Sequence, residues 1–223
     1  MLKALALTIV TALVSLPASA SLILETYSSG SANPNTIGGY AMTDFNLIAG
    51  NAGDAISSIS SPISGSVGLS DQYGNPVSLG FADSTTWWVN GEANDSNIFT
   101  TGTNTITIVL PENTLAFAFN VGANQNAQGW IDTFETNGSG LSGNSRHYFS
   151  PSASNTPGFG VYADSSQECS YLSSIVIDPT FIWGAGNFSI NQGSCNTAVP
   201  EPSPIILLGL GLVGLVIIRR KNS

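Results

Sequence analysis

Positively charged residues, histidine and cysteine are all scarce in this chain. Its 223 residues include five Lys and Arg, one His and two Cys. Catalytic zinc sites normally use several His ligands, and structural zinc sites use a closed set of Cys and His, so this composition argues against both. The chain also lacks the G-x-S-x-G nucleophile elbow, which is the signature of the α/β-hydrolases.

The few basic residues lie mainly at the two ends of the chain. Between Ser21 and Val199, Arg146 is the only one, against thirteen acidic residues, so this stretch has a net charge near −12 with His neutral. Binding to phosphates requires Lys and Arg, so the composition argues against nucleic acid and anionic membranes as partners. Divalent cations and neutral glycans are the compatible partners.

Residues 1–20 have the pattern of a secretory signal peptide. Lys3 gives a positive n-region, residues 4–16 form an apolar h-region, and Ala18-Ser19-Ala20 supplies the A-x-A cleavage site. We therefore predict cleavage after Ala20 and export of the mature chain.

The C-terminal residues 199–223 contain a short apolar run. Every residue from Ile205 to Ile218 is apolar or Gly. As a transmembrane helix over residues 204–218, this run would span roughly 21 Å, against a hydrocarbon core of about 30 Å. The span is short for a permanent anchor.

Distinct polar signals lie on both sides of this run. Arg219, Arg220 and Lys221 should remain cytoplasmic by the positive-inside rule. The prolines of Pro200-Glu201-Pro202 disfavour helix, so this segment should be extended and accessible just outside the bilayer. An extended segment in that place suits a membrane-bound processing enzyme.

This tail resembles the PEP-CTERM sorting signal of Gram-negative bacteria, with the sequence Val-Pro-Glu-Pro-Ser at 199–203, a Gly- and Leu-rich helix and a closing Arg-Arg-Lys. The resemblance implies that an exosortase recognises Pro200-Glu201-Pro202 and removes or exchanges the anchor. It also implies an inner-membrane intermediate, a final location at the cell surface or in the extracellular matrix, and a link to exopolysaccharide and biofilm. An ordinary C-terminal anchor is the alternative, and the LPxTG motif of a Gram-positive sortase substrate is absent.

Residues 21–198 are predicted to form one all-β domain, a single β-sandwich. Apolar residues alternate in 105–110 and again in 115–121, and Pro111-Glu112-Asn113 between them predicts a turn, so we expect a central hairpin here. Residues 30–39 and 48–62 are rich in Ser, Gly and Asn, and we expect long loops. Further strands are predicted at 22–27, 66–69, 76–81, 85–89, 129–136, 146–149, 159–163, 171–177 and 187–190.

Parts of this domain also resemble ectodomains often carried ahead of PEP-CTERM tails. The resemblance rests on residues 115–122, 158–163, 173–177 and 186–188, and it implies a jelly-roll or lectin-like sandwich. In that pattern an acid commonly precedes the Asn of the last strand, whereas this chain has Gly186 before Asn187. A ligand role for an acid at this position is therefore not carried over.

Cys169 and Cys195 are expected to form a disulfide, because the domain is exported and holds no other cysteine. They flank the last two predicted strands. If those strands pair antiparallel with Ile175 opposite Ser189, the two cysteines face each other. A catalytic thiol is the alternative, and it would need His147 nearby.

Two loop features are candidates for ligand binding. Trp87 and Trp88 are adjacent, so in a strand they point to opposite faces, and one of them could stack on a glycan. Glu92 and Asp95 follow in an acidic loop whose oxygens suit Ca²⁺. Core packing of the tryptophans and ordinary turn formation by Asn and Asp are the alternatives.

No residue set indicates an enzyme. His147 is the only histidine, and a strand-edge surface position is its simplest explanation. Asp132 and Glu135 could form a glycosidase pair only at a separation of about 5 Å or 6.5–9.5 Å. Trp130 and Trp183 are further candidates for glycan stacking. We therefore expect a non-enzymatic surface protein without a cofactor. The alternative is a carbohydrate-binding module, which would depend on Ca²⁺ if the acidic loop binds this ion.

Overall fold

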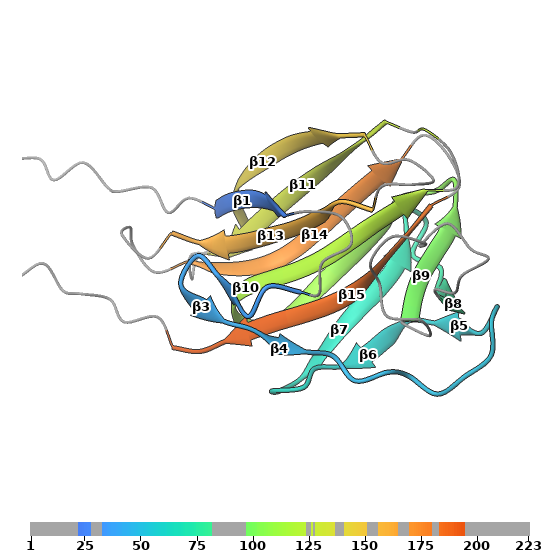
Figure 1. Cartoon of the computed structure of the whole chain (residues 1–223), viewed down its shortest axis with the longest axis horizontal. Coiled ribbons are helices and arrows are strands. Elements are labelled where there is room, and N and C mark those ends of the chain that lie inside the picture. The colour runs from blue at the N-terminus through green and yellow to red at the C-terminus, as the bar shows by residue number, and fades with distance from the viewer. Residues whose placement is uncertain are drawn as a thin grey trace, which may run out of the picture.

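The computed structural model describes residues 22–27, 33–81, 97–123, 126, 128–136, 141–150, 156–164, 170–179 and 183–194. This part of the chain is all-β and antiparallel, without a helix (Figure 1). The strands are β1 (Leu22–Tyr27), β2 (Thr36–Ile37), β3 (Tyr40–Ala41), β4 (Thr43–Asp44), β5 (Ala55–Ile56), β6 (Ser58–Ser60), β7 (Ser66–Asp71), β8 (Val77–Phe81), β9 (Asn97–Gly102), β10 (Ile106–Ala123), β11 (Gly129–Thr136), β12 (Leu141–Phe149), β13 (Gly158–Ala163), β14 (Tyr171–Pro179) and β15 (Trp183–Gln192).

The longest strand, β10, replaces the expected central hairpin, so that prediction was wrong. Residues 111–113 do not reverse the chain but lie where the register shifts between Val109 and Thr114. Asn113 adopts a positive φ of 62°, and the Thr114 hydroxyl donates to the Pro111 carbonyl at 2.7 Å. These features bend the strand, as a bulge does, and the chain then continues in the same direction.

The bend divides the partners of β10 between two layers. Before it, β10 pairs with β14 and β7; after it, β10 pairs with β13 and β15. The first layer therefore runs β12-β11-β14-β10-β7-β6, and the second runs β1-β13-β10-β15-β9-β8-β5. A strand that bends from one sheet into the other is a recognised way to close a sandwich.

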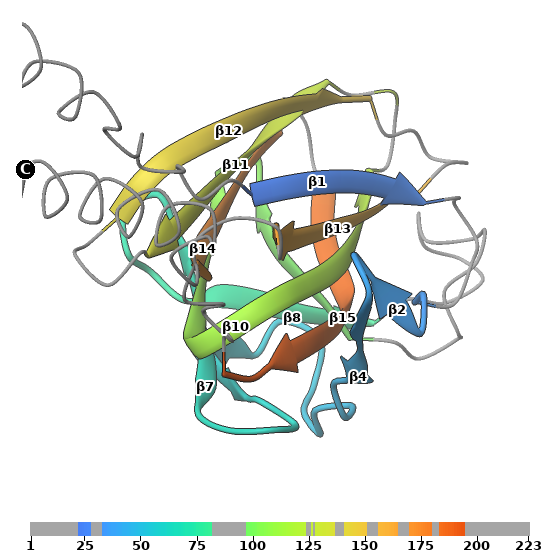
Figure 2. The same ribbon diagram turned by 90° about the vertical axis from the view of Figure 1, so that its left-hand side faces the viewer.

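The two layers enclose one hydrophobic core. Inward residues of the first layer, such as Ile108 and Ile175, belong to the same buried cluster as Phe117 and Phe159 of the second. Direct contact is clearest where the Phe149 ring of β12 meets the Phe159 ring of β13 at 5.3 Å between centroids. In Figure 2, β12 and β11 lie across from β1 and β13. This arrangement confirms the predicted all-β sandwich.

The second half of β10 is buried throughout, and the hairpin β2–β3 covers the outer side of its neighbour β13 in the second layer. Ile37 on this hairpin is 1% exposed and lies against Gly160, where an added Cβ would come within 2.8 Å of its Cγ2 atom. The Tyr40 hydroxyl donates to the Ala163 carbonyl at 3.1 Å. Short strands therefore occur in both segments that we expected to be long loops, 30–39 and 48–62, because tertiary pairing supports them.

The expected pairing of the two strands beside the cysteines, with Ile175 opposite Ser189, was wrong. Ile175 pairs with Ile108 and Thr133, whereas Ser189 pairs with Ala118 and Asp44, so β14 and β15 are not neighbours. Both strands nevertheless meet β10 at one place, since Leu172 and Gln192 each pair with Thr114. Cys169 and Cys195 themselves lie outside the described residues, and their disulfide stays a prediction.

Gly186 is a position where no side chain fits. It lies on β15 beside β9, and an added Cβ would come within 2.5 Å of the Asn97 backbone oxygen and 3.1 Å of Ile98. An acidic residue before Asn187 would therefore separate the two strands. This contact gives a physical reason for the departure from the ectodomain pattern.

Gly186→Ala should consequently destabilise the fold. We expect the free energy of unfolding to fall by about 1–3 kcal/mol, because backbone rather than a flexible side chain must yield. Urea denaturation measures this change. Gly193→Ala is the matched control, since its nearest neighbour is a Leu115 methyl group at 3.3 Å. Equal effects of the two substitutions would contradict the explanation.

Candidate functional site

Most of the residues singled out in the sequence lie outside the described residues. They are Trp87, Trp88, Glu92, Asp95, Cys169, Cys195, Pro200, Glu201, Pro202, Arg219, Arg220 and Lys221. The predicted strand at 85–89 lies outside as well. Within the described part, no helix is long and apolar enough to span a membrane, and no group of three or more His, Cys, Asp or Glu side chains is placed to hold a metal ion.

The site that the structure does define is the outer face of β12, β11 and β14. Tyr148, Trp130 and Asp178 form one row across these strands, because Trp130 pairs with both of the others. Arg146 and Asp132 form the next row. Residues two apart on a strand share a face, so the two rows lie side by side.

The Arg146 guanidinium is held in one orientation. Its Nε donates to Asp132 Oδ1 at 2.8 Å, and its Nη2 donates to Asp132 Oδ2 at 2.7 Å. Its Cζ lies 4.0 Å above the centre of the Trp130 ring, which is a cation–π contact. The hydrogen bond to Asp132 raises the pKa of Arg146 above its ordinary value, and Tyr148 adds to this shift.

Asp178 is the group in this cluster whose bonding is incomplete. It is partly buried, and it takes no hydrogen bond from any described residue. Desolvation raises the pKa of the Asp178 carboxyl, Arg146 lowers it, and Asp132 raises it further. A partly desolvated carboxylate that has no donor among the described residues can accept hydrogen bonds from a ligand.

The two carboxylates of the postulated glycosidase pair lie in different surroundings. Asp132 is bonded to Arg146 on the outer face, whereas Glu135 follows a register shift after Phe134 that interrupts the pairing of β11 with both of its neighbours. Glu135 is 5% exposed and accepts a hydrogen bond from the Ser170 hydroxyl. The two carboxylates are therefore engaged by different partners, Asp132 by Arg146 and Glu135 by Ser170.

His147 differs from its expected surface position, whereas Trp183 takes the core position that was the alternative to glycan stacking. His147 is partly buried, and its ring meets the edge of Phe159 at 6.0 Å between centroids, so it faces the interior rather than lying on the surface. Trp183 is fully buried, and its Nε1 donates to the Asn104 carbonyl at 3.1 Å. Trp183 is therefore closed to a ligand, and the Trp130 ring is partly exposed with Arg146 over one face.

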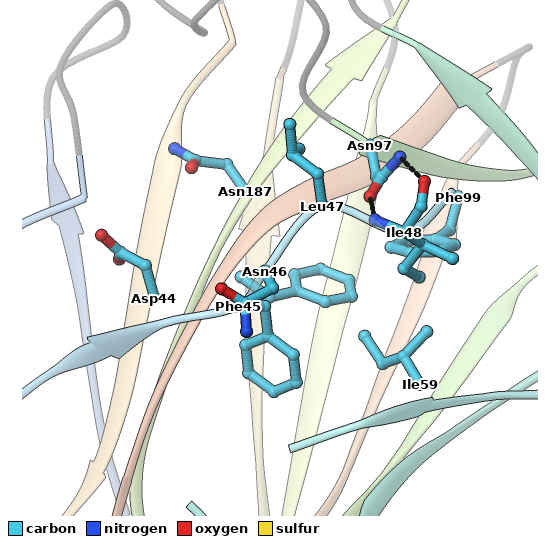
Figure 3. Close-up of a pocket in the computed structure, with 10 residues that line it drawn as sticks. Asp44, Phe45, Asn46, Leu47, Ile48, Ile59, Asn97, Phe99 and Asn187 are labelled. Carbon is cyan, nitrogen blue, oxygen red and sulfur yellow. Dashed lines mark hydrogen bonds between the residues drawn. The ribbon is translucent and has the colours of Figure 1, made fainter. Parts of the chain in front are cut away.

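One hollow lies beside β4 and β15 and is small. It encloses about 60 Å³ between Phe45, Ile59 and Phe188, and the Asn97 side chain closes one side by bonding both backbone groups of Ile48 (Figure 3). Ligand pockets commonly measure about 300–1,000 Å³, so this hollow suits water rather than a sugar ring.

A larger hollow of about 280 Å³ lies at the bend of β10, between Pro111, Glu112 and Tyr171. It exists because the bulge separates β10 from β14. Its shape approaches that of a ligand pocket, but the described contacts place no oriented donor and acceptor pair in it. The outer face of β12, β11 and β14 is better defined chemically.

Sequence reasoning missed Tyr148, Arg146 and Asp178 as one group. The sequence did hold a signal for this cluster. Trp130 and Asp132 are two residues apart on one predicted strand, and Arg146 and Tyr148 are two residues apart on another, so each pair shares a face. What the sequence could not provide was the register that sets Trp130 opposite Tyr148 and Asp178.

Comparison with known protein families finds a match at the C-terminus. The model of the PEP-CTERM protein-sorting motif matches residues 198–221. The chain carries a PEP-CTERM sorting motif. No curated protein matches the chain. The PEP-CTERM motif marks an exosortase-targeted surface protein, and it implies export, a terminal transmembrane segment and a location at the bacterial cell surface or envelope.

Proposed function

We propose that the exported domain is a non-enzymatic component of an exopolysaccharide matrix or biofilm in a Gram-negative bacterium. In this proposal the chain pauses in the inner membrane, with Pro200-Glu201-Pro202 outside the bilayer, and the exosortase then separates the sandwich from its helix. The observation that supports the proposal is the sorting motif at residues 198–221.

The non-enzymatic part of the proposal is supported by the placement of the acids and the histidine. Asp132 is bonded to Arg146, Glu135 is buried and accepts a hydrogen bond from Ser170, and His147 packs against Phe159. None of these groups shares a cleft with a second catalytic candidate among the described residues. A stable sandwich that carries a removable anchor needs no reaction of its own.

The mass of the mature protein tests the processing step. Protein isolated from the extracellular matrix of its host should lack Arg219, Arg220 and Lys221, as measured by intact mass spectrometry. A strain without the exosortase should instead hold the chain with these residues in its membrane fraction. Mature matrix protein that retains the C-terminal residues would contradict the proposal.

A carbohydrate-binding module is the second candidate function. Trp87 and Trp88, which first suggested it, lie outside the described residues, as do Glu92 and Asp95 of the proposed Ca²⁺ loop. The observation that favours sugar binding is the cluster of Trp130, Arg146, Tyr148 and Asp178 on the outer face of the first layer. Matrix location and sugar binding are compatible, since a matrix protein gains retention by contacting the polymer.

A further inference from the structure

We propose that the outer face of β12, β11 and β14 binds an uncharged polysaccharide, with Tyr148 as the stacking surface and Arg146 and Asp178 as the hydrogen-bonding pair. The proposal rests on the matrix function and deepens it by giving the class of ligand and its place on the fold. We call these three residues and Trp130 the Tyr148 platform.

The first argument is exposure. Tyr148 is 72% exposed on a strand that, among the described strands, pairs only with β11. A large aromatic ring on an edge strand loses favourable burial unless something covers it. The flat face of a sugar ring carries a row of C–H groups that can pack on the Tyr148 ring. The hydroxyl groups at the edge of the sugar can remain in contact with water and polar side chains.

The second argument is hydrogen-bond complementarity. Arg146 is pinned by two bonds to Asp132, and a guanidinium has more N–H donors than these bonds use. Asp178 supplies the missing acceptor, since no described residue donates to it. Neighbouring sugar hydroxyls both donate and accept, so they can satisfy Asp178 and Arg146 together. A purely apolar partner would leave both groups unsatisfied.

The third argument is that the platform is already ordered. Arg146 lies on the Trp130 ring at 4.0 Å, and the bidentate Asp132 is 5% exposed. Long charged side chains normally lose rotamer freedom when they bind a ligand, which lowers the affinity. Arg146 is already held in one rotamer, so this entropy cost of binding is small. A preorganised guanidinium beside an exposed ring is more useful for recognition than for the stability of an edge strand.

The fourth argument is charge. Arg146 is the only base between residues 21 and 199 and is already neutralised by Asp132, with Asp178 adding a further negative charge. A polymer of uronic acids or a sulfated glycan would meet net repulsion here. The occupant is therefore a neutral polysaccharide.

Affinity electrophoresis of the full-length chain in nonionic detergent tests the proposal. Native gels would contain dextran or galactomannan as neutral probes, or alginate as a polyanionic one. We expect retardation by at least one neutral polymer and none by alginate. Tyr148→Ala should weaken the retardation by at least about tenfold, because stacking residues commonly dominate such sites.

Two variants separate binding from loss of structure. Tyr148→Phe keeps the ring and should retain most of the retardation. Tyr73→Ala removes a tyrosine that is equally exposed, at 74%, in the turn between β7 and β8, and should change nothing. Asp178→Asn should weaken binding without abolishing it, because an amide accepts less strongly than a carboxylate.

Failure of this inference and failure of the matrix function are distinguishable. Absence of retardation by both neutral polymers, or equal retardation of the parent chain and Tyr148→Ala, would overturn the platform. So would retardation by alginate alone. The same Tyr148→Ala chain should still be processed and exported, because its C-terminal tail is unchanged, and a processing defect shared by all variants would instead count against the proposed function.

Discussion

Replacement of Pro200-Glu201-Pro202 by three alanines should leave the chain in the inner membrane with its C-terminus intact. Pro200 and Pro202 fix φ and hold the segment extended, whereas alanines leave φ free and favour helix. An exosortase that reads an extended Pro-Glu-Pro would then find no site. Cell fractionation and intact mass measure the result, and we expect nearly all of the protein to shift from the exported to the membrane fraction.

The control for this experiment lies just upstream. Asn196→Ala changes a residue that precedes the matched segment of 198–221, so its processing should be normal. If the triple-alanine chain reached the matrix at its usual mass, recognition of Pro-Glu-Pro would be disproved. The Tyr148 platform would stand unaffected, because it concerns only the sandwich.

Phe117→Ala should lower the free energy of unfolding by about 3–5 kcal/mol, as for other fully buried aromatic residues. Phe117 is 0% exposed at the centre of β10, and its ring packs against Phe188 at 5.3 Å, Phe119 at 6.1 Å and Phe45 at 6.2 Å. Phe45 belongs to the segment after β4, so the Phe117 ring stabilises the packing of more than one element. Urea denaturation of the exported domain measures the change.

Val109→Ala is the matched control on the same strand. Val109 is 51% exposed on the outer face of the first layer, so its truncation should cost no more than about 0.5 kcal/mol. Similar losses for the two variants would mean that β10 does not form the centre of the core. That result would also contradict the two-layer description.

Alternation of apolar residues was enough to locate most strands. It predicted β1 and β11 with their observed bounds, and β13 and β8 to within one residue. Period-two patterns are reliable because each strand buries one face in a shared core. The same logic failed at Pro111-Glu112-Asn113, since turn-forming residues also build bulges, and only the partners on both sides decide between a reversal and a bend.

Segments with weak patterns depended on tertiary contacts. Ile37 and Ile59 lie in short strands within Ser-, Gly- and Asn-rich sequence, and both are buried because other strands pair with or face them. β9 was missed for a related reason, since Ile98 is buried on the outer side between Gly80 and Gly186. A strand that is buried on both faces does not show the alternation of apolar and polar residues by which strands are predicted.

The sequence by itself determined where this protein is sent and what class of fold it adopts. A sorting signal is recognised as a contiguous segment of sequence. The all-β class follows from the local alternation of apolar and polar residues. Only the tertiary structure decided which side chains meet: that Asp132 binds Arg146 while Glu135 binds Ser170, and that Trp130, Arg146, Tyr148 and Asp178 share one face. Register sets these neighbours, and register depends on long-range pairing that no local pattern specifies.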